Sequence, residues 1–105
     1  MDIEQLGSLF EEFLRIYKLV NRKIIIDLLT TELNTSQLLK LYELTDGEKP
    51  TREIASLLGN ISHVTVANIW KRWAIIGIVI PAERKGRYKA AFNLSEYGII
   101  SVENE

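Results

Sequence analysis

The chain has 105 residues, of which 47% are hydrophobic and 26% are charged, and it contains no cysteine. This composition indicates one folded domain with room for an appended helix, and it excludes disulfides, thiolate catalysis and zinc–thiolate sites. The apolar runs are too short to span a membrane and the N-terminus lacks the pattern of a signal peptide, so we expect a cytoplasmic protein.

The net charge of −1 is unevenly distributed along the chain. Residues 1–48 carry nine acidic and five basic side chains, whereas residues 71–95 carry six basic side chains and one acidic side chain. Local positive charge of this kind is typical of a surface that meets phosphate. We therefore expect any phosphate-contacting surface mainly within residues 71–95.

Residues 1–33 have the apolar spacing of a helical segment. Apolar residues recur at intervals of 3 and 4, the a/d pattern of a coiled-coil seam over about three heptads: Ile3, Leu6, Phe10, Phe13, Tyr17, Val20 and Ile24. We expect the first six to form a homodimer interface. The alternative is that the helix packs only on its own domain, where a broad apolar face is usual. The sequence leaves open whether the helix continues through Asn21.

Two further helices are predicted before residue 60. Asn34, Thr35 and Ser36 are good N-cap residues for the first of them, and residues 45–50 have turn composition. Thr51 is expected to cap the second, a short helix that Gly59 ends.

The helix 62–76 carries the candidate base-reading residues. Ser62 is its expected N-cap, and Val66, Ile69, Trp73 and Ile76 form its core face, with Trp70 alongside. The opposite face presents His63, Thr65, Asn68, Lys71 and Arg72. An Asn side chain pairs bidentately with adenine, and Lys or Arg reaches phosphate or guanine. Each residue alone fits an ordinary solvated surface, but as a group they favour a DNA-contacting face.

Residues 78–94 have the composition of a β-hairpin with a basic tip. Two β-type runs, 78–82 and 88–94, enclose a loop centred on Gly86. Pro81 lacks an N–H group, which places its strand at a sheet edge. We expect the basic residues at and after the tip to contact phosphate; the alternative is that they only protect a sheet edge.

This order of elements resembles the winged helix-turn-helix family of transcription regulators, which includes small prokaryotic and archaeal proteins of the MarR and ArsR kinds. The run Phe92-Asn93-Leu94-Ser95-Glu96-Tyr97-Gly98 is similar to the strand-to-helix ending common in such regulators, with Ser95 as its N-cap. The resemblance covers residues 35–98 and departs from the family at Asn60, which we interpret as a one-residue extension of the turn.

The resemblance implies a mainly α fold with a small β-hairpin wing. It divides the chain into an N-terminal helical dimerisation segment (1–33), a winged helix-turn-helix domain (34–98) and a C-terminal tail (99–105). The recognition helix 62–76 would enter the major groove and the wing 83–89 would lie on the phosphate backbone. The residues expected to contact DNA are Arg52, Ser62, His63, Thr65, Asn68, Lys71, Arg72, Arg84, Lys85, Arg87 and Lys89.

The predicted function is a sequence-specific regulator that binds double-stranded DNA as a homodimer. The alternative is a winged-helix module that binds another protein and no DNA. No catalytic motif, cofactor site or metal site is predicted, because the chain has one His, no Cys and no nucleotide-binding loop. The sequence names no small-molecule effector.

Overall fold

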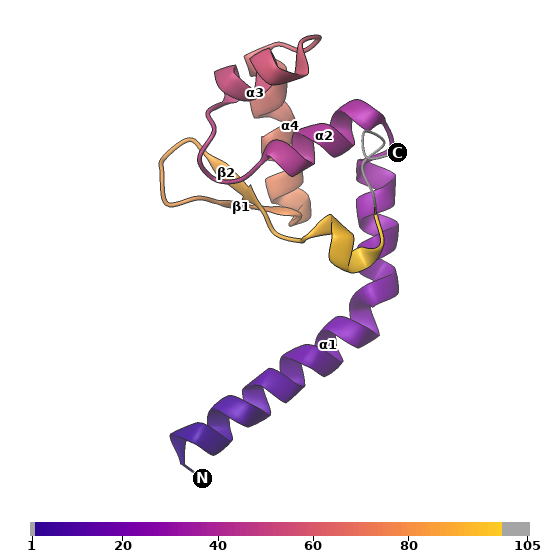
Figure 1. The fold of residues 1–105 in the computed structure, drawn as a ribbon, viewed down its shortest axis with the longest axis vertical. Helices are drawn as coiled ribbons and strands as arrows, with labels where there is room; N and C mark the ends of the chain where they lie inside the picture. Colours follow the sequence, from indigo (N-terminus) through magenta and orange to yellow (C-terminus); the bar gives the residue numbers. More distant parts are fainter. Residues whose placement is uncertain (1, 100–105) are drawn as a thin grey trace.

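The computed structural model describes residues 2–99 and is mainly helical, with one small antiparallel hairpin (Figure 1). This part of the prediction is confirmed. The predicted tail, residues 99–105, lies outside the described residues apart from Ile99. The elements are α1 (Ile3–Glu32), α2 (Ser36–Leu44), α3 (Thr51–Leu58), α4 (His63–Ile76), β1 (Val79–Pro81), β2 (Tyr88–Ala90) and the 3-10 helix η1 (Leu94–Tyr97).

Helix α1 is continuous through Asn21, so the first two predicted helical segments form one element. A capping box fixes its start, because Asp2 accepts a hydrogen bond from the Gln5 backbone while the Gln5 side chain accepts one from the Asp2 backbone. The N-terminal part of the helix stands away from the other elements (Figure 1). The radius of gyration is accordingly 16.0 Å, against about 13 Å for a compact domain of this size.

One hydrophobic core joins the C-terminal end of α1 to all the other elements. Leu29 and Leu33 are buried in it, whereas the six predicted interface residues, from Ile3 to Val20, are all exposed. Trp70 and Trp73 lie in the core, as their place on the apolar stripe predicts. The buried cluster consists of Leu29, Leu33, Leu41, Tyr42, Ile54, Ala55, Val66, Trp70, Trp73, Ile78, Val79, Leu94 and Tyr97.

Two of the predicted helix caps are confirmed and two are wrong. Thr35 and Ser62 accept hydrogen bonds from Leu38 and Thr65 backbone N–H groups and cap α2 and α4. Thr51 is instead the first residue of α3, because Pro50 takes the extended N-cap conformation and the helix starts directly after it. Ser95 lies inside η1, and the N-cap is Asn93, whose side chain accepts from the Ser95 N–H and hydroxyl.

The hairpin is shorter than predicted. Its register pairs Val79 with Ala90 and Pro81 with Tyr88, so each strand has three residues. The second strand ends early because the chain turns toward η1 after Ala91. Pro81 lies on the edge strand of the hairpin, as its missing N–H requires. On the other side of β2, an isolated β-bridge pairs Lys89 with Asp46. Within residues 2–99 the sheet therefore has two strands.

Two buried hydroxyl groups at the end of α2 connect the helices to the hairpin. The Tyr42 hydroxyl donates to the Ile78 carbonyl at 2.7 Å and accepts from the Phe92 N–H at 3.1 Å. Burial raises the pKa of Tyr42, so the phenol stays a donor. The Thr45 hydroxyl donates to the Leu41 carbonyl and accepts from the Trp70 indole at 3.1 Å. Helices α2 and α4 and the chain that leaves the hairpin therefore meet at these two hydroxyls.

Replacing Tyr42 with Phe tests the first of these connections. The Ile78 carbonyl keeps a bond from the Ala91 N–H, but the Phe92 N–H loses the bond to Tyr42. We expect Tyr42→Phe to lower the free energy of unfolding by about 1–3 kcal/mol in urea denaturation. The control is Tyr88→Phe, because that ring packs on Trp70 while its hydroxyl bonds to no group within residues 2–99. Equal effects of the two substitutions would contradict this account.

Candidate nucleic-acid interface

Helices α3 and α4 follow each other in the chain, and a four-residue turn, 59–62, joins them. Gly59 has a φ of 90°, a conformation that disfavours other residues, and its N–H bonds to the Ala55 carbonyl to end α3. Ala55 itself is buried, which allows α3 to lie close across α4 (Figure 1). Asn60 is exposed within this turn.

The outward face of α4 carries three of the predicted site residues, and a fourth lies at the start of the helix. Thr65, Asn68 and Lys71 are exposed, and His63 is half-buried at the start of the helix. Ser62 is exposed next to them, and its hydroxyl is engaged with the Thr65 N–H and hydroxyl. Ser62 therefore caps the N-terminal turn of α4, from which Val64 and Thr65 face outward.

Sequence reasoning missed two apolar residues on this outward face. Val64 is 57% exposed and Ile75 is 88% exposed. Val64 lies on the same face as Asn68 and Lys71, at i, i+4 and i+7. That spacing is readable from the sequence, but an apolar side chain within a helix is ordinarily assigned to the core.

Arg72 is held by α1. Its guanidinium donates twice to the Glu32 carboxylate, from Nε to Oε1 at 3.0 Å and from Nη2 to Oε2 at 3.0 Å. The Glu32 carboxylate raises the pKa of Arg72 above its usual value by hydrogen bonding. Since Glu32 is the last residue of α1, the pair connects α4 to the end of the long helix. A contact of Arg72 with a base competes with this bidentate ion pair.

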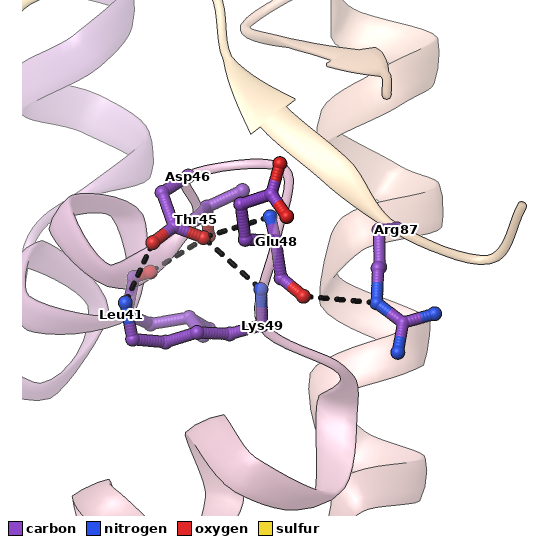
Figure 2. Close-up of polar contacts among 6 residues, drawn as sticks. All are labelled: Leu41, Thr45, Asp46, Glu48, Lys49 and Arg87. Carbon is purple, nitrogen blue, oxygen red and sulfur yellow. Dashed lines mark hydrogen bonds and ion pairs between the residues drawn. The ribbon is translucent and has the colours of Figure 1, made fainter. Parts of the chain in front are cut away.

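The hairpin tip presents Arg84 and Lys85 to solvent. Arg87 behaves differently, because it is half-buried and its Nε donates to the Glu48 carbonyl at 3.0 Å (Figure 2). This bond joins the hairpin to the turn between α2 and α3. Lys89 is exposed on β2, and its backbone forms the bridge to Asp46.

Asp46 organises the turn that leads into α3. Its Oδ1 accepts from the backbone N–H groups of Glu48 and Lys49, and its Oδ2 lies 2.6 Å from the Lys49 ammonium (Figure 2). The hydrogen bond from Lys49 is the main reason that the pKa of Asp46 is lowered from 3.8 to about 2. The sequence identified the turn but not its organiser, although Asp before Gly is a strong local signal for a side-chain-to-backbone turn.

Apart from the basic residues of α1, the exposed positive charge of the predicted site comes from α3, α4 and the hairpin. Arg52 is exposed in the first turn of α3, Lys71 on α4, and the remaining residues on the hairpin. Three acidic residues, Asp46, Glu48 and Glu83, line the hollow beside the hairpin together with Arg84 and Lys89. The positive surface of the predicted site is therefore modest: Arg84 and Lys85 lie together at the hairpin tip, and Lys71 is the basic residue of α4 that is not paired with Glu32.

The Asp46 turn makes stability depend on pH. A carboxylate whose folded-state pKa is lowered stabilises the fold above the unfolded value, 3.8, and this contribution is lost as the pH falls through about 2. We expect Asp46→Ala to lower the free energy of unfolding at pH 7 by less than about 1 kcal/mol, because the pair is partly exposed. The difference from the unmodified chain should shrink between pH 3.8 and about 2 in urea titrations.

Lys49→Met is the companion variant. It removes the ammonium but keeps the two backbone donors of the turn, so we expect a smaller loss with the same pH dependence. An Asp46→Ala protein that keeps the full acid sensitivity of the unmodified chain would contradict this interpretation.

Within residues 2–99, no helix is long and apolar enough to cross a membrane, and no three His, Asp or Glu side chains gather as a possible metal site. Comparisons with protein-family models, curated proteins and solved structures give no match for this chain. Any functional assignment therefore depends on the residues described above and on their arrangement.

Proposed function

We propose that the protein is a homodimeric, sequence-specific transcription regulator that binds double-stranded DNA through a winged helix-turn-helix. The observation that carries the proposal is the outward face of α4, which carries Thr65, Asn68 and Lys71 on the same domain as a basic hairpin tip. An α-helix fits the major groove of B-DNA, where base pairs are distinguishable by their edges.

Residues on α4 would read bases. Asn68 can bond bidentately to adenine, and the methyl groups of Val64 and Thr65 suit contact with the thymine methyl group. All three side chains are exposed in the first two turns of the helix. His63 and Ser62, at the N-terminus of α4, would meet phosphate, since helix N-termini favour anions.

Basic residues on the other elements would fix the register on the backbone. Arg84 and Lys85 at the hairpin tip, Arg52 on α3 and Lys89 on β2 are exposed and suited to phosphate. Arg72 and Arg87, which the sequence placed in the same group, are assigned a different primary role. They hold α4 against α1 and the hairpin against the α2–α3 turn.

A dimer would compensate for the modest charge of one domain. Two recognition helices spaced by about 34 Å reach successive major grooves on one side of the duplex. The exposed apolar face of α1 is the surface available for such pairing. The competing function is a winged-helix module that binds only protein. Measurements of DNA binding distinguish the two functions.

Salt dependence of DNA binding tests the proposal. We expect fluorescence anisotropy with random-sequence duplexes to show affinity that falls steeply with the logarithm of salt concentration. Arg84→Ala with Lys85→Ala should make the slope shallower by about 4, because the dimer loses two phosphate contacts in each subunit and each lost contact removes about one unit. The charge-conserving control, Arg84→Lys with Lys85→Arg, should keep the slope.

A variant on α4 should behave differently. Asn68→Ala is expected to leave the salt slope unchanged and to relax sequence preference by about 1–3 kcal/mol at one base pair. Absence of binding at low salt would overturn the proposed function and favour the protein-binding module.

A further inference from the structure

The first two thirds of α1 expose a broad apolar surface that no other element within residues 2–99 covers. Exposure of its large apolar side chains ranges from 38% at Leu14 to 89% at Ile3. Folded monomers rarely expose so long a contiguous apolar surface. The members are Ile3, Leu6, Leu9, Phe10, Phe13, Leu14, Ile16, Tyr17, Leu19, Val20 and Ile24.

Charges along this part of the helix are segregated by sign. Residues 2–12 contain four acidic and no basic side chains, and residues 13–26 contain four basic and no acidic side chains. The acidic set is Asp2, Glu4, Glu11 and Glu12, and the basic set is Arg15, Lys18, Arg22 and Lys23.

The helix dipole does not explain this order. Its effect is confined to the first and last turns. Glu11 and Glu12 lie well beyond the first turn, and the basic set lies in the middle of the helix. The last turn holds no basic residue and ends at Glu32. The segregation therefore indicates a partner that meets both halves.

We infer that the partner is a second copy of this chain, whose α1 lies antiparallel to the first and crosses it near Phe13. This inference rests on the homodimer of the proposed function and specifies its geometry. An antiparallel pair brings each acidic half beside the basic half of the other copy. A parallel pair would align like charges at every level along the two helices, and this longer-range repulsion is unfavourable at low ionic strength. Phe13 lies between the two charge blocks and near the midpoint of the apolar seam.

A groove beside α1 fits the same arrangement. A cavity of about 690 Å³ lies between α1 and the chain that leaves the hairpin, lined by Tyr17, Asn21 and Ile24 on one side and by Phe92 and Tyr97 on the other. With a crossing near Phe13, the first two turns of the partner helix run beside this groove, because they lie opposite residues 16–24. Apolar side chains of those turns would fill it.

The far wall of the groove is fixed to α1. The Arg22 guanidinium donates to the Glu96 carbonyl at 2.8 Å and lies 5.4 Å from the centre of the Tyr97 ring. The groove is therefore largely formed in the single chain, which lowers the cost of ordering it on association.

Crosslinking distinguishes the two orientations, because the natural chain has no cysteine. Leu6→Cys and Val20→Cys are single-cysteine variants on opposite sides of Phe13. In the antiparallel pair the two copies of residue 6 are about 21 Å apart along the axis, beyond the reach of a disulfide. We expect no covalent dimer from oxidised Leu6→Cys alone and a covalent heterodimer from its mixture with Val20→Cys. Efficient crosslinking of Leu6→Cys with itself would overturn the antiparallel geometry.

Charge reversal tests the electrostatic part. We expect Glu4→Lys with Glu11→Lys to raise the dimer dissociation constant by on the order of tenfold at low salt, measured by sedimentation. Adding Arg15→Glu and Lys23→Glu should restore it, since with a crossing at residue 13 these two positions lie opposite the reversed residues 11 and 4 of the other copy. Glu43→Lys with Glu83→Lys is the control with the same change in net charge. Failure of the fourfold variant to recover would contradict the pairing of the two halves.

Sedimentation also separates this inference from the proposed function. The unmodified chain should sediment as a dimer and Phe10→Glu with Phe13→Glu as a monomer that keeps its helical circular dichroism. A monomeric unmodified chain would overturn both the inference and the proposed dimer. A dimer that crosslinks in parallel would overturn the geometry alone, and DNA binding is judged separately by its salt dependence.

Discussion

Two hydroxyl groups buried at the end of α2 are the constraint on which the rest of the structure depends. Tyr42 and Thr45 bond to α4, to the start of the hairpin and to the chain that follows it. A chain of this size has a small core, so few alternative contacts hold these elements together. Because a buried polar group without a partner is costly, the two hydroxyls define one arrangement of helix and hairpin.

Helix α1 is packed into the core at its C-terminal end and exposed along its N-terminal part. Its last turns are packed through Leu29 and Leu33, and Glu32 is paired with Arg72 of α4. Its first turns are uncovered. Since the helix is continuous between these parts, the proposed crossing of two copies would set the distance and the angle between two α4 helices. In this account, α1 connects the surface that pairs two copies to the helix α4 that reads bases.

Much of this fold was predictable from local chemistry, whereas the roles of the long side chains were not. Ser62 caps α4 and Trp73 faces the core because capping and apolar periodicity are properties of neighbouring residues. Thr51 was placed as a cap because its chemistry fits one, but Pro50 already has the required backbone conformation. Arg87 was assigned to phosphate, yet its partner, Glu48, is distant in sequence and becomes a neighbour only in the fold. Val64 was missed because an apolar residue on a helix suggests the core.

The central claim is that the outward faces of two α4 helices read one DNA site together. Selection of bound duplexes from a random pool, followed by sequencing, tests it most directly. The account predicts enrichment of an inverted repeat whose half-sites are centred about 10 base pairs apart, or a multiple of that distance. A pool that shows no enrichment after repeated selection at low salt would contradict the claim.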